Sequence, residues 1–189
     1  MTLYLASSSV YRRELLERLA LPFDCHSPDI DEQRLVGEDP NDYVQRLAKE
    51  KARTVASANA TAWVIGSDQT AVLGDDILGK PGTEANAVKQ LKACAGKTVR
   101  FLTSLCLWTP DQVQLMVDTT EVEFRDLNEH EIRRYVAREQ PLNCAGSFKV
   151  EGYGISLFKA VRSHDPSALI GLPLIALCQQ LRRAGAQLP

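Results

Sequence analysis

The stretch LYLASSSVYRRELLERL, residues 3–19, decides the fold class. Leu3 to Ala6 are apolar enough to form a short buried strand, and the serines at positions 7–9 follow as a loop. From residue 10 onward, apolar side chains recur at helical spacing among arginines and glutamates, at Val10, Leu15, Leu16 and Leu19. A strand, a loop and a helix in this order are typical of α/β folds.

The rest of the chain alternates between predicted strands and predicted helices. Further strands are expected at residues 23–27, 63–66, 70–73, 77–78, 99–108 and 113–124, and through Phe158. Further helices are expected at about 41–58, 83–94, 128–137 and 173–183, with N-cap residues at Asp39, Thr83 and Asn128. Because strands and helices intermingle, we expect an α/β fold with a large mixed sheet and flanking helices.

The composition excludes several classes of protein. A chain of 189 residues can bury one sizeable core, so we expect a single domain over residues 1–189. Its 22 Lys and Arg against 24 Asp and Glu give a net charge of −2, so no long nucleic-acid partner is expected. The five cysteines lack metal-binding spacing, which argues against a structural zinc site or a disulfide framework.

The sequence shows neither a signal peptide nor a membrane span. The apolar start of the chain has no basic segment before it. The longest mostly apolar run, residues 169–178, is interrupted by Gly171 and Pro173, whereas a membrane-spanning helix needs about 20 apolar residues. We therefore expect a cytoplasmic protein with no membrane partner.

A lysine interrupts the apolar face of the predicted helix at 41–58. The apolar stripe of this helix consists of Val44, Leu47, Ala48, Val55 and Ala58. Lys51 falls on the same stripe, so its side chain either extends past its neighbours to water or pairs with an anion. The helix pattern alone leaves both interpretations open.

Asp68 is the second unusual position. It follows the apolar residues 63–66, where the strand is expected to end, and ligands of α/β sheets collect at strand ends. A carboxylate at such a place can hold a metal ion or activate water. The alternative, a helix-capping aspartate, is disfavoured because the following residues predict a hairpin.

Several further polar residues lie in predicted loops. Ser7 and its neighbouring serines, with Arg12, form either a phosphate cradle at a helix start or an ordinary helix cap. Lys80, between two glycines, either approaches a ligand or is a surface lysine, and Glu32 either offers oxygen to Mg²⁺ or belongs to a solvated acidic loop. Without a nucleophile motif, these residues suit Mg²⁺-assisted attack of water on a phosphate chain.

Six blocks of the sequence resemble the Maf nucleotide pyrophosphatases. Residues 5–16, LASSSVYRRELL, are similar to the opening signature of that family. The other blocks follow in the family's order, with IDE at 30–32, LAKEKA at 47–52, IGSDQ at 65–69, GKP at 79–81 and IGLP at 170–173. The resemblance covers nearly the whole chain.

The resemblance implies a fold and an assembly. The fold would be like that of the inosine-triphosphate pyrophosphatases, an elongated mixed sheet with two lobes around a nucleotide cleft. It also implies a nucleoside triphosphate as substrate, a divalent cation, Mg²⁺ or Mn²⁺, and a homodimer.

The resemblance also assigns residues. Asp68 matches the family's proton acceptor, and the polar cleft residues are matched by Ser7, Arg12, Glu32, Lys51 and Lys80. By this hypothesis Asp68 and Glu32 hold the metal ion, Asp68 orients or deprotonates water that attacks the α phosphorus, and the cationic side chains offset charge on the leaving pyrophosphate.

Two stretches, GSDQ at 66–69 and NCAGSFKVEG at 143–152, are similar to one branch of the family, which hydrolyses 7-methyl-GTP to 7-methyl-GMP and pyrophosphate. Tyr11, Gln69 and Glu151 match the positions at which the family chooses a base. The 7-methylguanine ring is cationic and is attracted to an aromatic face such as that of Tyr11, while Glu151 could accept hydrogen bonds from guanine. The chain departs from the family pattern at Val10, usually proline, and at Tyr11, commonly tryptophan in this branch.

Three alternatives remain open at this point. The first is a pyrophosphatase for dTTP, UTP or another modified nucleotide. The second is a non-catalytic regulator of septum formation, since members of the family are associated with bacterial division. The third is a module that binds a cap-like nucleotide without cleaving it.

Overall fold

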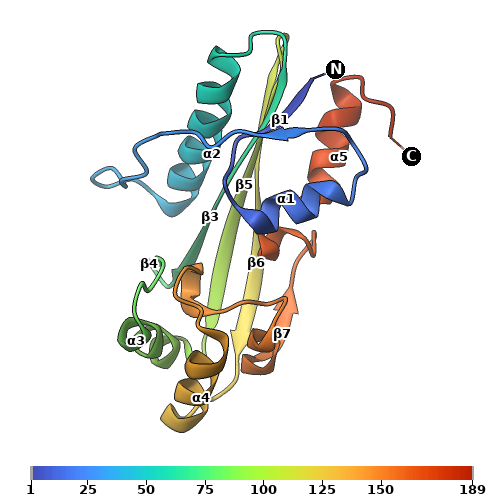
Figure 1. The fold of residues 1–189 in the computed structure, drawn as a ribbon. Helices are drawn as coiled ribbons and strands as arrows, with labels where there is room; N and C mark the ends of the chain where they lie inside the picture. Colours follow the sequence, from blue (N-terminus) through green and yellow to red (C-terminus); the bar gives the residue numbers. More distant parts are fainter. Residues whose placement is uncertain (1, 189) are drawn as a thin grey trace. The chain divides into compact units, whose positions relative to one another are not determined.

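The computed structural model describes residues 2–188, which contain one mixed sheet of seven strands (Figure 1). The strand order is β2-β1-β3-β5-β6-β7, and β4 pairs with β3. The strands are β1 (Leu3–Leu5), β2 (Asp24–Cys25), β3 (Trp63–Leu73), β4 (Asp76–Leu78), β5 (Thr98–Trp108), β6 (Val113–Phe124) and β7 (Phe158–Arg162). β1 lies parallel to β2 and to β3, whereas β3 with β4 and β6 with β7 are antiparallel. The predicted mixed α/β sheet is confirmed.

The helices begin close to where the capping residues predict. They are α1 (Val10–Glu17), α2 (Pro40–Ser57), α3 (Glu84–Cys94), α4 (Glu129–Glu139) and α5 (Leu174–Arg183). The side chains of Asp39, Thr83 and Asn128 each accept a hydrogen bond from a free N–H in the first turn of α2, α3 or α4. Pro173, the N-cap of α5, supplies no such side-chain bond.

The chain divides into two compact units. The first comprises the chain up to Gln69, residues 103–118 and the chain from Asp165 onward, and the second comprises residues 70–102 and 119–164. The division agrees with the two predicted lobes, while the nucleotide cleft and the single domain stay predictions.

The first unit has helices on both faces of its part of the sheet (Figure 1). α1 and α5 cover one face, where Leu15 and Leu177 pack with Ile65 and other buried aliphatic residues. α2 covers the other face through small side chains, including Ala48 and Ala52 against Val64. Alternate residues of β3 therefore serve opposite cores, as the two-residue period of a strand requires.

The second unit has an aromatic core. Phe101, Phe124, Phe148 and Phe158 form edge-to-face pairs with ring centroids 4.7–5.8 Å apart. This geometry places the positive edge of one ring against the negative face of another. Helices α3 and α4 contact each other in the same unit.

Two predicted strand boundaries are wrong. The strand expected at 63–66 continues through Asp68 to Leu73, so Asp68 lies inside β3 and not at a strand end. The reason is that the polar side chains of this stretch find partners inside the protein, as Ser67 and Asp68 both do. The last strand, β7, begins at Phe158 instead of running through it.

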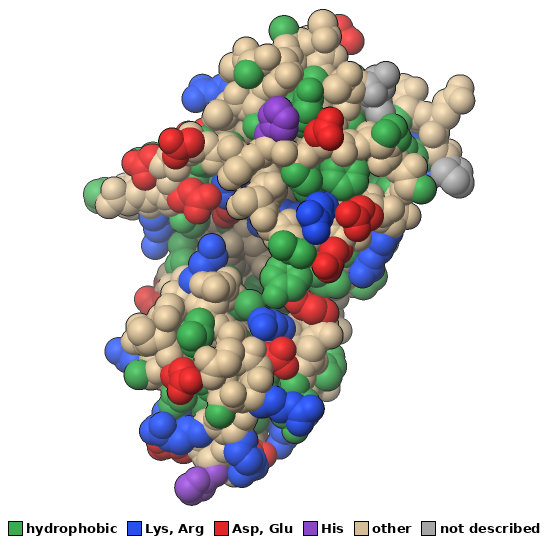
Figure 2. Space-filling model, in the orientation of Figure 1, with side chains coloured by type: hydrophobic (Ala, Val, Ile, Leu, Met, Phe, Trp, Pro, Cys, Tyr) green, Lys and Arg blue, Asp and Glu red, His purple; other side chains and the backbone are tan. Residues whose placement is uncertain are grey.

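The surface carries charges of both signs. Figure 2 shows Lys and Arg side chains interspersed with Asp and Glu on the visible face, in keeping with the net charge of −2. Across residues 2–188, no helix has the length and apolar character to cross a membrane.

Candidate active site

The candidate site begins with a close approach between α2 and β3. A Cβ atom added at Gly66 would lie 2.1 Å from the carbonyl oxygen of Ala48 and 2.9 Å from the Cβ of Ala52. Only glycine allows the helix backbone to come so near the strand. This contact brings Lys51, on the sheet-facing side of α2, over Asp68 of β3.

Lys51 pairs with two carboxylates. Its Nζ lies 2.7 Å from Oδ1 of Asp68 and 2.7 Å from Oε1 of Glu32. Lys51 is 7 % exposed and Asp68 is 8 % exposed, whereas Glu32 is exposed. Of the two interpretations left open by the sequence, pairing with an anion is therefore the one that holds. Sequence reasoning identified all three residues, and the structure brings them together.

The loop that carries Glu32 is fastened to α2. The guanidinium of Arg46 donates to the carboxylate of Glu38 at 2.7 and 3.0 Å and to the carbonyl of Gln33 at 3.0 Å. The hydroxyl of Tyr43 donates to the carbonyl of Glu32 at 2.9 Å. The hydrogen bond from Arg46 lowers the pKa of Glu38 to about 2, so the carboxylate of Glu38 is ionised at neutral pH.

Arg12 lies in the first turn of α1 and reaches back to the loop before it. Its Nη1 donates to Oγ of Ser7 at 3.4 Å, and its Nε donates to the carbonyl of Gly171 at 2.9 Å. Ser9 caps the helix through the N–H of Arg12. Burial lowers the pKa of Arg12, while the negative charges of Asp68 and Glu32 act in the opposite direction. A guanidinium nevertheless remains charged in proteins, so Arg12 is a cation that interacts electrostatically with both carboxylates.

Gln69 is held by a loop far away in sequence. Its Nε2 lies 2.9 Å from Oγ1 of Thr103 and 2.9 and 3.1 Å from the carbonyl oxygens of Ala168 and Leu169, so the two hydrogens of the amide are shared among three acceptors. Thr103 itself donates to the carbonyl of Ala168 at 3.0 Å. These neighbours offer acceptors to the amide NH₂, so the amide oxygen of Gln69 is the group left to accept a hydrogen bond from a ligand.

Sequence reasoning missed two buried hydroxyls beside these residues. Ser67 donates to the carbonyl of Gly171 at 2.9 Å, and Thr103 completes the acceptor set around Gln69. Both residues are fully buried. A signal existed for Ser67, which interrupts an apolar strand next to Asp68, but Thr103 stands in an ordinary strand pattern.

The hydrogen bonds described above do not include the remaining predicted residues, Tyr11, Lys80 and Glu151. Tyr11 is the second residue of α1 and is 38 % exposed. Lys80 and Glu151 are exposed residues of the second unit. The approach of Lys80 and Glu151 to Asp68 stays a prediction.

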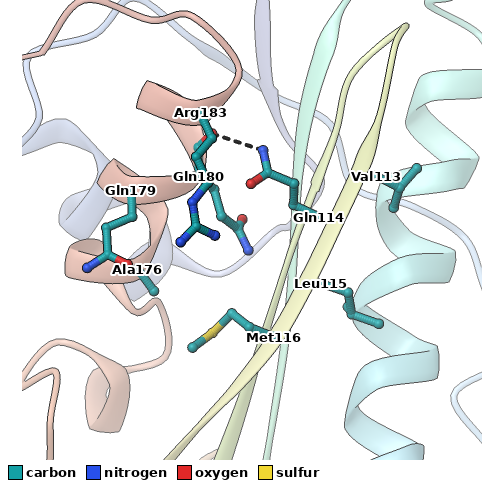
Figure 3. Close-up of a pocket in the computed structure, with 8 residues that line it drawn as sticks. All are labelled: Val113, Gln114, Leu115, Met116, Ala176, Gln179, Gln180 and Arg183. Atoms are coloured by element: carbon teal, nitrogen blue, oxygen red, sulfur yellow. Dashed lines mark hydrogen bonds between the residues drawn. The ribbon is translucent and has the colours of Figure 1, made fainter.

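One cavity of the first unit lies elsewhere. Figure 3 shows this cavity of about 400 Å³ between β6 and α5, lined by Val113, Gln114, Leu115, Met116, Ala176, Gln179, Gln180 and Arg183. Gln114 spans it by donating to the carbonyl of Gln180 at 2.9 Å. None of the predicted site residues lines this cavity.

Two carboxylates of the site are candidate donors for a metal ion. Within the described chain, residues 2–188, no group of three or more His, Cys, Asp or Glu side chains is arranged to hold a metal. Asp68 and Glu32 nevertheless lie close together, because one oxygen of each is 2.7 Å from Nζ of Lys51. That pair suits a cation that takes its other ligands from water and phosphate, as Mg²⁺ does.

Comparisons with known proteins give consistent results. Residues 2–184 match the family model described as "Maf-like protein". The chain is 56 % identical over 187 residues to the 7-methyl-GTP pyrophosphatase of Xanthomonas axonopodis pv. citri, covering 99 % of this chain and 98 % of that protein. It is 53 % identical over 190 residues to the protein of the same name from Alcanivorax borkumensis, covering 100 % and 96 %.

Among solved structures, the Ham1 protein of Staphylococcus aureus has a similar fold. The TM-score is 0.59 at 15 % sequence identity, and the match covers 98 % of this chain and 100 % of that one. At this identity the likeness concerns the fold alone.

Proposed function

The chain belongs to the Maf family, and from this membership we propose that it hydrolyses 7-methyl-GTP to 7-methyl-GMP and pyrophosphate. Relatives more than half identical over their full length carry the name 7-methyl-GTP pyrophosphatase. The observation that carries the chemistry is the contact of the buried Lys51 with Asp68 and Glu32, at 2.7 Å to each.

Asp68 and Glu32 would hold a divalent cation, Mg²⁺ or Mn²⁺. Two neighbouring carboxylates, each paired with Lys51 through one oxygen, fit such an ion in charge and ligand type. When bound, the ion would neutralise charge on the phosphate chain.

The protein's own side chains supply the rest of the reaction. Asp68 accepts a proton from the attacking water, a step for which a carboxylate held in place by Lys51 is suited. Arg12 and Lys51 face the negative charge that develops on the leaving pyrophosphate, with Ser7 beside Arg12 and Lys80 as a further cation.

Base choice is assigned to Tyr11, Gln69 and Glu151. The free amide oxygen of Gln69 and the carboxylate of Glu151 are acceptors, and guanine presents N–H donors at N1 and N2. The exposed ring of Tyr11 offers an aromatic face for a cationic methylated base, an attraction of about 0.5–2 kcal/mol. We also propose a cytoplasmic location and a homodimer. Light scattering of the purified protein, which measures its molar mass, tests the homodimer.

The test is pyrophosphate release with Mg²⁺ from 7-methyl-GTP, GTP, UTP, dTTP and ITP. We expect 7-methyl-GTP to be preferred, and Asp68→Asn to lower kcat by about 10²–10⁴-fold, the range for loss of a general base. Circular dichroism of the variant checks that its fold is intact. Near-normal turnover by a folded Asp68→Asn variant would refute the assignment of this residue.

The other outcomes identify the alternatives. Preference for UTP or dTTP would keep the pyrophosphatase and remove the base assignment to Tyr11, Gln69 and Glu151. Binding of 7-methyl-GTP without release of pyrophosphate would favour a binding module. The absence of both binding and turnover would favour a regulator.

A further inference from the structure

Four side chains of the candidate site region depend on one short loop. The loop, residues 167–171, offers three carbonyls: Ala168 and Leu169 accept from Gln69, and Gly171 accepts from both Arg12 and Ser67. Thr103 adds a fourth donor, to Ala168. The donors come from α1, β3 and β5, so the conformation of this loop sets where Arg12 and Gln69 lie.

A buried carboxylate just before the loop controls that conformation. Asp165 is 3 % exposed, and its Oδ1 accepts hydrogen bonds from the backbone N–H of Ser167 at 3.0 Å and from the hydroxyl of Ser167. Its other oxygen, Oδ2, accepts from the backbone N–H of Ile175 at 2.7 Å. Asp165 thus ties the start of the loop to the first turn of α5.

Residues that precede helix α5 and its N-cap residue supply the acceptors for its first N–H groups. Pro173 gives α5 no side-chain cap, and the N–H groups of Leu174 and Ile175 would otherwise lack acceptors. Oγ of Ser167 accepts from Leu174 at 2.8 Å, and Asp165 accepts from Ile175. The backbone N–H groups of Ile170, Gly171 and Leu172 donate to the carbonyl of Ser167, which closes the loop on itself.

We propose that Asp165 is a positioning residue, which holds the loop 167–171 so that its carbonyls orient Arg12 and Gln69. Asp165 acts on these side chains through the backbone carbonyls of the loop. This inference rests on the proposed pyrophosphatase function for its kinetic consequences, but the positioning itself has a readout independent of activity.

The variant that tests this is Asp165→Asn. An amide has one acceptor oxygen, so its NH₂ group must face one of the N–H donors that the carboxylate now satisfies. We expect the KM for 7-methyl-GTP to rise between about twofold and about 30-fold, the range for residues that couple to a site without touching ligand. The preference for 7-methyl-GTP over UTP falls with it, while kcat changes less.

A matched control separates positioning from helix stability. Asn128 caps α4 by accepting from the N–H of Glu131 at 3.0 Å and has no bond to the loop 167–171. Asn128→Ala is therefore expected to lower the unfolding temperature without changing KM or base preference. If Asp165→Asn fails to fold, Ser167→Ala takes its place, with a smaller rise in KM. It removes the acceptor for Leu174 and the hydroxyl that donates to Asp165, and it leaves the carboxylate of Asp165 in place.

NMR of the free protein tests the positioning directly. The side-chain signals of Arg12 Nε–H and Gln69 NH₂, assigned by their loss in Arg12→Lys and Gln69→Ala, should shift in Asp165→Asn and exchange faster with solvent. The same signals should stay unchanged in Asn128→Ala.

The outcomes are distinct. Unchanged Arg12 and Gln69 signals in a folded Asp165→Asn variant, or an unchanged KM and base preference in an active one, overturn the proposal. A wild-type protein that releases no pyrophosphate from any nucleotide refutes the proposed function instead, and the NMR signals then decide the positioning alone.

Discussion

Lys51 shows what one position in the sequence could and could not reveal. Its place on the apolar stripe of a helix identified it as unusual, but the stripe did not distinguish a solvent-reaching side chain from a paired one. The answer depended on Gly66, which lets α2 approach β3 closely enough for Lys51 to meet Asp68. That approach is a property of two elements and not of the lysine.

Replacing Lys51 with methionine should destabilise the protein. The variant leaves the mostly buried carboxylate of Asp68 without its cation, and we expect the free energy of unfolding to fall by about 2–4 kcal/mol. Urea denaturation at neutral pH measures the change. Lys49→Met is the control, because Lys49 is exposed on the same helix and its replacement should cost no more than about 0.5 kcal/mol. Equal effects of the two substitutions would contradict a buried ion pair.

Gln69 illustrates the limit of reasoning at the scale of one residue. The resemblance assigned it to base choice, yet its amide is oriented by Ala168 and Leu169, about a hundred positions along the chain. No local pattern around residue 69 announces that contact. Thr103 was missed for the same reason, since its partner Ala168 is 65 positions away, whereas Ser67 carried a local signal that was not used.

At the scale of elements, the sequence predicted more reliably. Each expected helix exists, and the caps at Asp39, Thr83 and Asn128 are confirmed because a cap is a contact between residues two or three apart. The prediction that the strand ends before Asp68 was wrong. Polar side chains there suggested a strand end, but they are buried with distant partners and the strand continues.

Gly66→Ala tests the approach of α2 to β3. The added methyl would overlap the carbonyl of Ala48, so the helix must move and we expect a loss of at least about 2 kcal/mol in the free energy of unfolding. Gly79→Ala is a suitable comparison, because no atom lies within 4 Å of the Cβ position there. Urea denaturation of both variants measures the difference, and a Gly66→Ala protein as stable as Gly79→Ala would show that the approach carries no constraint.

At the scale of the whole molecule, the sequence indicated the fold class and not the order of the strands. Intermingled strands and helices are enough to expect a mixed sheet. The neighbours of β3 in that sheet, β1 on one side and β5 on the other, are set by long-range pairing that local periodicity does not encode. The family resemblance added the expectation of two lobes, with which the division into two units agrees, but it gave no strand order.

Removal of the metal ion should affect turnover and leave the fold intact. The proposed ion rests on two carboxylates, and the cores described above consist of aliphatic and aromatic side chains. A chelator should therefore abolish pyrophosphate release, with recovery on adding Mg²⁺, while the unfolding temperature stays within about 2 °C. A change of 1 kcal/mol would move that temperature by about 2–4 °C in a chain of this size. A larger fall on chelation would point to a structural ion instead.

The shared carbonyl of Gly171 also bears on how this protein can be altered by evolution or by design. One oxygen receives both Arg12 and Ser67, and its neighbours in the same loop receive Gln69. Replacing Gln69 with an apolar residue would remove the donor to the carbonyls of Ala168 and Leu169. The loop would change its conformation in response, and the same loop holds Arg12 through the carbonyl of Gly171. A new base preference therefore requires substitutions at Gln69 and in residues 167–171 together.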